Sequence, residues 1–446
     1  MKSNKQQRRQ PPPRPKKQTD GDGGQDCAEG HVRTVSRLLT AVALLLIAAV
    51  AVAIRVLKSV RFGTLLDEYE PYFNQYIVGK MSEDGIVATM QSHDNQVWYP
   101  YGRQIGSTIL PGLTIVTTLL HSALHFVFGP SINVEHLCVY FPPICAAFSA
   151  VTGFFLTAEL WRGQALYGRR KPTDSGASSG QAASMGAGLF TAAFTAMLPG
   201  MLPRTLSGNF TNESLGGVLM LLFFQQWLVC LRLRTTLSAM RCGVVGFLLA
   251  ATWDGYVFAL NVVAVHVIVL VVSHAMSGGN AVTSNTFSVV PKHLFRAYSV
   301  TYTVCAILAT MLPFYHSNGG VLNFVFEIPH AIPLSVLAYL QFCAAFHFLH
   351  KRRLSANVQD NQSTTAMAGP SLQRLRVYAL LLSTLVAAVP ISLFGSTGGQ
   401  FLPVRLLDVD HMIGPLCFTL FELYVCDTTV HFGIDSIRRH CCISRG

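Results

Sequence analysis

The stretch that decides the fold is LLTAVALLLIAAVAVAI, residues 38–54, which carries no charge and is flanked by Arg37 and Arg55. A helix needs about 20 mostly apolar residues to cross a bilayer, and this run with its flanks supplies them. A basic tail precedes it and no small-residue cleavage site follows it. We therefore predict a retained first span with the N-terminus in the cytosol.

The composition of the whole chain extends this interpretation. The chain has 446 residues, 51% of them hydrophobic and 12% charged, about half the roughly 25% charged residues of a soluble domain. The net charge is +11, but seven Lys and Arg lie in the first 17 residues, so +4 remains for the rest. These numbers exclude a soluble enzyme, a disordered protein and a nucleic-acid partner, and predict an all-α polytopic membrane protein.

The domain organisation follows from charge and composition. We predict a disordered basic cytosolic tail over residues 1–34, a membrane domain over 35–435 and a short C-terminal tail over 436–446. The eleven cysteines are scattered without metal-ligand spacing, which argues against zinc. Cys441 and Cys442 follow two arginines and are candidates for palmitoylation.

The number of spans follows from basic loops, because Lys and Arg concentrate in cytosolic loops. Four such loops, near residues 162–171, 232–241, 292–296 and 351–376, require paired crossings between them. The predicted crossings after the first are 137–158, 185–203, 215–231, two within 242–273 around Asp254, 297–315, 331–349 and 377–395. This gives about 9–10 transmembrane helices. The last run, 412–434, contains two acids and is left undecided.

The loops between these spans differ in character. The cytosolic loops 162–184 and 351–376 are predicted to be flexible, because both contain Ser-, Gly- and Thr-rich stretches. The outer loop, about 58–136, is acidic at first and then apolar over 105–128. Only one span can lie between this loop and the first basic loop, so we predict residues 105–128 to form an amphipathic or re-entrant helix on the outer face.

Two acidic groups face the outer side. The first is DEYEPYFN, residues 67–74, and the second is SGNFTNES, residues 207–214. Carboxylates that meet below a membrane surface suit Mg²⁺ or Mn²⁺, which prefer oxygen ligands. The spacing alone favours solvated loop acids over a metal site, because E-x-E and N-E pairs are weak signals.

Four ordered motifs resemble the catalytic subunit of oligosaccharyltransferase. WYPYGRQIGSTILPGL at 98–113 resembles a signature of that family, and DEYEPYFN resembles its H-E-F-D-P-[WY]-F-N-Y-R. LPGMLPRTLSGNFTNE at 198–213 resembles V-P-G-Y-I-S-R-S-x-A-G-x-[FY]-D-N-E, and WDGYVFALN at 253–261 resembles W-G-G-Y-V-F-x-x-N. The resemblance covers residues 36–300 and, more weakly, the chain to Arg405. It implies the membrane domain of a GT-C type glycosyltransferase.

The resemblance implies a function in protein N-glycosylation in the endoplasmic-reticulum membrane. Family members transfer a preassembled oligosaccharide from a dolichyl pyrophosphate donor to the Asn of Asn-x-Ser/Thr in nascent polypeptides, with Mn²⁺ or Mg²⁺ as cofactor. The implied partners are the bilayer, both substrates and other glycosylation subunits. The resemblance implies that Glu70 and Glu213 are catalytic and that Glu68, Glu70 and Glu213 bind the metal. It further implies six substrate-binding residues: Trp98, Tyr99, Arg103, Arg204, Asn74 and Arg405.

The chain departs from the family at several positions of these motifs, and the family's Arg after Asn-Tyr is missing, because Gln75 and Tyr76 follow Asn74. Glu70 and Thr211 stand where the family has metal-binding Asp residues, and Asp254 stands where it has Gly. Asp254 is either a compensating acid or a destabilising one. The S-V-S-E-H-Q-P and W-W-D-Y-G motifs are absent, so we expect a C-terminally shortened member without the lumenal globular domain. A non-catalytic family member and a degenerate gene product remain alternatives, and a transporter is a more distant one.

Two sequons lie on the predicted outer face. Asn209 with Thr211, and Asn212 with Ser214, each form Asn-x-Ser/Thr and are possible glycosylation sites. A third, at Asn361, is predicted to lie in the cytosol, where no glycan would be added.

Overall fold

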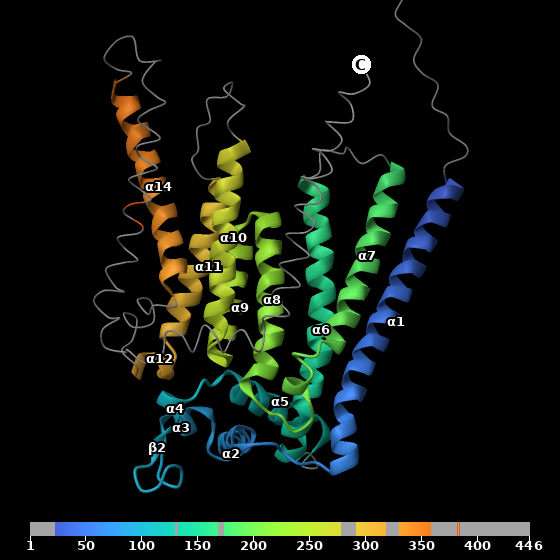
Figure 1. The fold of residues 1–446 in the computed structure, drawn as a ribbon, viewed down its shortest axis with the longest axis vertical. Helices are drawn as coiled ribbons and strands as arrows, with labels where there is room; N and C mark the ends of the chain where they lie inside the picture. Colours follow the sequence, from blue (N-terminus) through green and yellow to red (C-terminus); the bar gives the residue numbers. More distant parts are fainter. Residues whose placement is uncertain are drawn as a thin grey trace, which may run out of the picture.

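The computed structural model describes residues 23–129, 133–167, 174–277, 291–317 and 330–357, together with residues 381 and 383. Long helices stand side by side in a bundle, and short elements lie across one end of it (Figure 1). The long helices are α1 (Gly23–Phe62), α6 (Val134–Tyr167), α7 (Asp174–Met197), α8 (Asn212–Leu233), α9 (Thr236–Thr252), α10 (Tyr256–Ser277), α11 (Lys292–Thr310) and α14 (Ala331–Asn357).

The short elements gather at the lower end of the bundle in Figure 1, which we call the outer end. They are α2 (Tyr69–Asp84), α3 (Ile86–Gln91), α4 (Ile105–Thr108), α5 (Gly112–Phe128), the 3-10 helix η1 (Pro203–Thr205), α12 (Pro313–Ser317), and the strands β1 (His93–Asp94) and β2 (Arg103–Gln104). The strands pair antiparallel, with His93 opposite Gln104 and Asp94 opposite Arg103.

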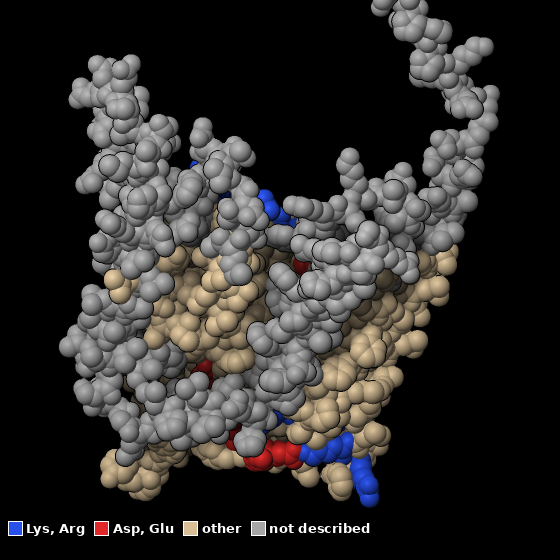
Figure 2. Space-filling model, turned by 45° about the horizontal axis from the view of Figure 1, so that its top comes forward, with Lys and Arg blue, Asp and Glu red and all other residues tan. Residues whose placement is uncertain are grey.

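Four helical segments in the described part of the chain are long and apolar enough to cross a membrane: Thr34–Phe62, Val134–Arg162, Asn212–Leu233 and Tyr256–His274. On α1 the large apolar side chains point outward, as Leu38 and Leu45 do at 64% and 69% exposure. A surface of this kind is stable against lipid and unfavourable in water. Figure 2 shows a mostly uncharged surface between two charged edges, with Lys and Arg beside acidic atoms toward its upper edge and charged residues of both signs at its lower edge.

The largest buried cluster lies where α8, α9, α10 and α11 pack together. Small residues let the backbones approach: a Cβ on Gly243 would lie 2.8 Å from the Cβ of Val304, and one on Gly246 would lie 3.0 Å from the Phe223 ring. Such small-residue contacts are typical of helix packing in membranes, where apolar burial alone drives little association.

A second bundle region joins α1, α6 and α7 through buried alanines, among them Ala51, Ala150 and Ala192. Arg55 is buried in the same region at 1% exposure. Its Nε donates to Thr205 Oγ1 at 2.6 Å, and its Nη1 donates to the carbonyl oxygens of Ala51 and Ala196 at 3.0 and 2.9 Å. Arg55 therefore connects the first helix to the segment that leads into the second acidic motif.

Three predicted boundaries were wrong because helices propagate beyond the apolar runs. Helix α1 begins at Gly23, inside the predicted tail. No proline lies between Pro15 and the end of this helix, and adding residues to a formed helix costs little. The predicted loop 162–184 is helical up to Tyr167 and again from Asp174, where Ala, Gln and Met are good helix formers. Helix α14 also runs to Asn357, into the predicted loop 351–376.

Two further predictions at the outer end need correction. The helix expected over 105–128 is two helices, α4 and α5, because Leu110 precedes Pro111 and such a residue disfavours helical geometry. The all-α prediction overlooked the two-residue β1–β2 pair. The break around Asp254 is confirmed, since α9 ends at Thr252 and α10 begins at Tyr256. Residues 377–395 and 412–434 and the C-terminal tail 436–446 lie outside the described part of the chain, apart from residues 381 and 383.

Candidate active site at the outer end

The site begins at the N-terminus of α8, where the first N–H groups have no partner within the helix. Thr211 is the N-cap residue and has extended geometry, but its side chain makes no capping bond. Instead, the backbone N–H of Asn212 donates to the carboxylate of Glu70, which lies in the first turn of α2. The positive end of the α8 dipole favours an acid at this place.

Asn74 lies one turn beyond Glu70 and ties α2 to the same loop. It is buried, its Nδ2 donates to the carbonyl oxygen of Phe210 at 3.1 Å, and its side chain also hydrogen-bonds Glu70. Gly208 closes the arrangement with φ +89, and a Cβ there would meet the carbonyl oxygen of Leu65 at 2.2 Å. The two acidic motifs predicted to face the outer side are thus joined by specific contacts.

Glu213 follows in the first turn of α8 and forms an ion pair with Arg204, with Nη1 and Oε2 2.6 Å apart. Glu213 also interacts electrostatically with Glu70 and with Asp254. Predicted site residues Glu70, Asn74, Arg204 and Glu213 therefore lie together, as their motifs suggested.

The carboxyl of Glu70 has a raised pKa. The largest cause is the surrounding protein, which displaces water from the carboxylate although the residue is exposed. Repulsion from Asp254 and Glu68 raises the pKa further, while the hydrogen bonds from Asn212 and Asn74 oppose the shift. Protons are therefore held more tightly here than on a free glutamate, and a bound cation would compete with them.

The expected cation ligands Glu68, Glu70 and Glu213 do not converge on one point. Within the described residues, no three or more His, Cys, Asp or Glu side chains are grouped closely enough to hold a metal ion. However, buried oxygens beside Glu70 and Glu213 lack a hydrogen-bond partner, namely Thr211 Oγ1 and Asn212 Oδ1. Two carboxylates with neutral oxygens are a donor set that fits Mg²⁺ or Mn²⁺ in chemistry.

The WYPYGR motif forms the connection between β1 and β2. Trp98 and Tyr99 are 64% and 85% exposed, so this loop presents aromatic rings to its surroundings. The guanidinium of Arg103 stacks between the rings of Trp98 and Phe73, 4.8 Å from each centroid, and its Nε donates to Thr108 Oγ1 at 2.8 Å. Phe73 belongs to α2, the helix that also carries Glu70, so Arg103 packs the aromatic loop against that helix.

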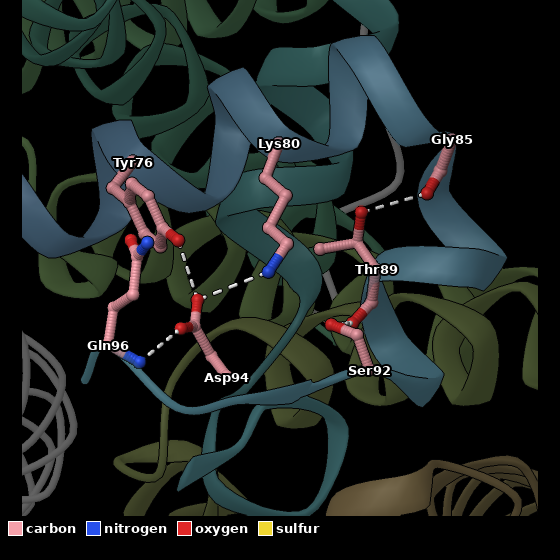
Figure 3. A network of polar contacts seen from close by, with 7 residues as sticks. All are labelled: Tyr76, Lys80, Gly85, Thr89, Ser92, Asp94 and Gln96. Carbon is pink, nitrogen blue, oxygen red and sulfur yellow. Dashed lines mark hydrogen bonds and ion pairs between the residues drawn. The ribbon is translucent and has the colours of Figure 1, made fainter. Parts of the chain in front are cut away.

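A polar network that sequence inspection missed holds the β1–β2 pair against α2 (Figure 3). Asp94 is buried at 4% exposure and accepts hydrogen bonds from Tyr76 Oη at 2.6 Å, Lys80 Nζ at 3.1 Å and the Gln96 N–H at 2.9 Å. The Tyr76 bond is the main cause that lowers the pKa of Asp94 to about 2 and raises the pKa of Tyr76 to about 12. The i,i+4 spacing of Tyr76 and Lys80 was the available signal.

The same network ends in local bonds within the preceding turn. In Figure 3, Thr89 Oγ1 donates to the carbonyl oxygen of Gly85 at 2.9 Å, and Ser92 Oγ donates to that of Thr89 at 2.8 Å. The first bond joins α3 to its N-cap residue Gly85, and the second closes the C-terminal end of α3 at Ser92, just before β1.

The two outer sequons are engaged in structure. Asn209 Nδ2 donates to the carbonyl oxygen of Pro203 at 2.9 Å, and the Thr211 side chain is buried at 6% exposure. Asn212 contributes its backbone N–H to Glu70. Both predicted glycosylation sites thus lie inside the acidic site, while Arg405 and Asn361 lie outside the described residues.

These features define a class: a helical membrane-type bundle whose outer end carries an acidic site between a short surface helix and the start of a long one. The family model for the N-terminal part of oligosaccharyl transferase STT3 matches residues 38–165 and 181–413. The chain therefore belongs to the STT3 family.

Relatives and solved structures agree with this assignment. The stt-3 subunit of dolichyl-diphosphooligosaccharide–protein glycosyltransferase from Caenorhabditis elegans is 27% identical over 319 residues, which are 71% of this chain and 36% of that protein. The STT3B subunit from Oryza sativa subsp. japonica is 27% identical over 277 residues, 62% of this chain and 33% of that protein. The chain thus spans about a third of the length of these relatives.

The fold is similar to archaeal oligosaccharyltransferases. The Archaeoglobus fulgidus AglB complex with an inhibitory peptide and a dolichol-phosphate has a TM-score of 0.54 and 14% identity, covering 84% of this chain and 39% of AglB. The complex of the Archaeoglobus fulgidus oligosaccharyltransferase with zinc and sulfate has a TM-score of 0.53 and 16% identity, covering 79% of this chain and 40% of that one.

Proposed function

We propose that this chain acts in protein N-glycosylation as a diverged catalytic subunit, transferring a preassembled oligosaccharide from a dolichyl pyrophosphate to the Asn of Asn-x-Ser/Thr in nascent polypeptides. The observation that carries the proposal is the joining of Glu70 and Glu213 at the N-terminus of α8, within the span matched by the family model. Arg204 and the stacked Arg103 are the neighbouring cations suited to phosphate oxygens.

In this proposal the protein groups have distinct roles. The backbone of Asn212 and the side chain of Asn74 favour the charged form of Glu70, whose carboxylate would bind the amide of an acceptor Asn. Glu213 and Glu70 would hold Mn²⁺ or Mg²⁺, with the neutral oxygens of Thr211 and Asn212 beside them. A cation there would neutralise the charge of the pyrophosphate leaving group.

We propose that the chain crosses the endoplasmic-reticulum membrane several times with its N-terminus in the cytosol and the acidic site on the lumenal side. Support comes from Arg232, Arg234 and Arg241, which lie around the α8–α9 connection at the end of the bundle opposite to α2. Basic residues of this kind concentrate on the cytosolic side. The partners would be bilayer lipid, both substrates and further glycosylation subunits.

A second candidate is a non-catalytic family member that binds the lipid-linked oligosaccharide or glycosylation partners. The observation that favours it is Thr211, whose neutral hydroxyl stands at a position where an acid would add a full charge beside Glu213. This function would keep donor binding without transfer.

Complementation of cells that lack their own STT3 subunit tests both candidates. Expression of the full 446-residue chain should restore occupancy of sequons on a reporter glycoprotein, and Glu213→Gln should abolish it. Glu83→Gln, an exposed acid on α2, is the matched control. Expression without any gain in occupancy would refute transfer by this chain, and donor binding in that case would support the second candidate.

A further inference from the structure

A group of cations lies at the end of the bundle opposite to the acidic site. Residues 214–326 contain five Lys and Arg and a single acid, Asp254, and the turn that carries Asp254 lies at the outer end. Arg232 pairs with Glu159 of α6. The other four cations are exposed and form no ion pair in the described part of the chain, and we call them the basic rim: Arg234, Arg241, Lys292 and Arg296.

The packing of α9 on α11 places three of these cations at one height. Later residues of α9 contact later residues of α11, so the two helices run parallel. Thr301 Oγ1 donates to the carbonyl oxygen of Ala239, 62 residues earlier, at 3.2 Å. With the same offset, Arg234 lies level with Arg296, and Lys292 lies about one turn beyond. The end of the bundle therefore carries a band of positive charge across two neighbouring helices.

An exposed apolar stripe runs along α9 from this band toward the outer end. Leu237, Met240, Val244 and Leu248 recur at helical spacing on one face and are all exposed. Arg241 lies on the same face, between Met240 and Val244. The stem of an arginine at such a position lies along apolar surface while its guanidinium reaches the level of lipid headgroups. The stripe suits acyl chains, and the cation suits a phosphate.

Positive charge is in excess at this end. His293 lies in the first turn of α11, where burial lowers its pKa and repulsion from Arg234 and His274 lowers it further. Lys292 is the first residue of the same helix, where the helix dipole adds a partial positive charge. The neighbouring segments supply no acid to offset these groups. An anion from outside the chain would relieve the repulsion.

Resting on the orientation of the proposed function, we infer that the basic rim binds anionic phospholipids of the cytosolic leaflet. The headgroup phosphate and the carboxylate of phosphatidylserine pair with the exposed guanidinium and ammonium groups, and acyl chains lie along the stripe of α9. Clusters of about four or more Lys and Arg directly beside a membrane span are typical of surfaces that bind such lipids. A free anion would match the charge of the rim but would leave the stripe without a partner.

Native mass spectrometry of the detergent-purified full chain tests this inference without any assay of transfer. The chain is titrated with dioleoyl phosphatidylserine and, in parallel, with dioleoyl phosphatidylcholine, and the bound lipid is counted. Phosphatidylserine should bind more tightly. Lys292→Gln combined with Arg296→Gln should weaken its binding about 25-fold, because each cation beside an anionic headgroup contributes a factor of about five. Binding of phosphatidylcholine should not change.

Two controls separate a lipid site from charge in general. Arg37 is an exposed cation toward the same end of α1, on the far side of the bundle from α11 in Figure 1. Arg37→Gln should bind phosphatidylserine as the unmodified chain does, although it removes the same charge from the same side of the membrane. Lys292→Arg combined with Arg296→Lys keeps both charges and should also bind normally, which excludes an effect of altered packing.

Three results would overturn the inference. They are equal affinity of the unmodified chain for both lipids, unchanged phosphatidylserine binding when Lys292→Gln and Arg296→Gln are combined with Arg234→Gln and Arg241→Gln, and displacement of phosphatidylserine by millimolar inorganic phosphate, which would indicate a site for free anions. Binding in detergent requires neither transfer nor a particular orientation. Loss of this inference would therefore leave the proposed function standing, and failure of complementation would leave the lipid site standing.

Discussion

Replacing Arg55 by Met should destabilise the bundle and loosen the segment that leads to the site. Arg55 bonds Thr205 Oγ1 and the carbonyl oxygen of Ala196 across helices, at 2.6 and 2.9 Å. The Ala196 carbonyl lies in the last turn of α7, where it has no i+4 partner within the helix. Met has a similar length and fills the volume, but it donates no hydrogen bond.

The magnitude follows from these two bonds. Loss of the charged bond to Thr205 is worth about 1.5–3 kcal/mol, and leaving the Ala196 carbonyl buried and unpaired costs about 1–3 kcal/mol. Relief from burying the guanidinium offsets part of the sum. We therefore expect a net loss of about 2–5 kcal/mol, roughly a 30- to several-thousand-fold change in the folded-to-unfolded ratio.

Unfolding by SDS in mixed micelles, followed by far-UV circular dichroism, measures this loss. Arg61→Met, on the same helix at an exposed position, should stay within about 0.5 kcal/mol of the unmodified chain. If Arg55→Met were equally neutral, the interhelical bonds would be contributing nothing, and the reasoning from burial and hydrogen bonding would be refuted.

Three other perturbations test separate parts of the structure. Glu159→Gln removes the buried carboxylate that two arginines share and should cost about 1–3 kcal/mol in the same assay, whereas the exposed Glu135→Gln should be neutral. The lowered pKa of Asp94, about 2, adds stability that is complete above the unfolded value of about 4 and disappears as pH falls toward 2. The protection factors of the amides of residues 92–104, which are exchange rates corrected for the intrinsic effect of pH, should therefore fall on acidification, and Asp94→Asn should show low protection at neutral pH too; equal protection in both would contradict the network. Gly216→Ala places a Cβ 2.8 Å from that of Trp253, so it should destabilise the bundle by about 1–3 kcal/mol in the SDS assay, and unchanged stability would argue against close packing of the Trp253 turn on α8.

The positions of the long helices could be predicted from the sequence because apolar runs and basic loops report the membrane directly. The break at Asp254 was predicted from the same apolar runs. The meeting of the motifs around Glu70 and Glu213 was implied by the family resemblance, because it joins residues far apart in the chain and spacing alone favoured solvated loop acids. Helix ends were not predictable, since α1 and α7 continue through polar residues at little cost once the apolar part is helical.

Tertiary polar contacts escaped prediction for a physical reason. In the sequence, Arg55 directly follows an apolar run and indicates the end of a span. In the fold it is buried, and its partners Thr205 and Ala196 lie far along the chain. Asp94 looks like one more loop acid until the β1–β2 pair brings it under Tyr76 and Lys80. The partners of Arg55 share no sequence period, and the i,i+4 spacing of Tyr76 and Lys80 places those two side chains on one helix face without pointing to Asp94.

The same reasoning changes how the substitutions at Thr211 and Asp254 are interpreted. Motif by motif, one position loses an acid and another gains one, and the two changes look independent. In the fold the turn at Asp254 packs on the first turn of α8, three residues beyond Glu213. Charges interact according to their separation in space and not according to the segment that carries them. Because Asp254 and Glu213 interact electrostatically, the substitutions at Thr211 and Asp254 change the charge of one region, and their effects on transfer in the complementation assay should depend on each other.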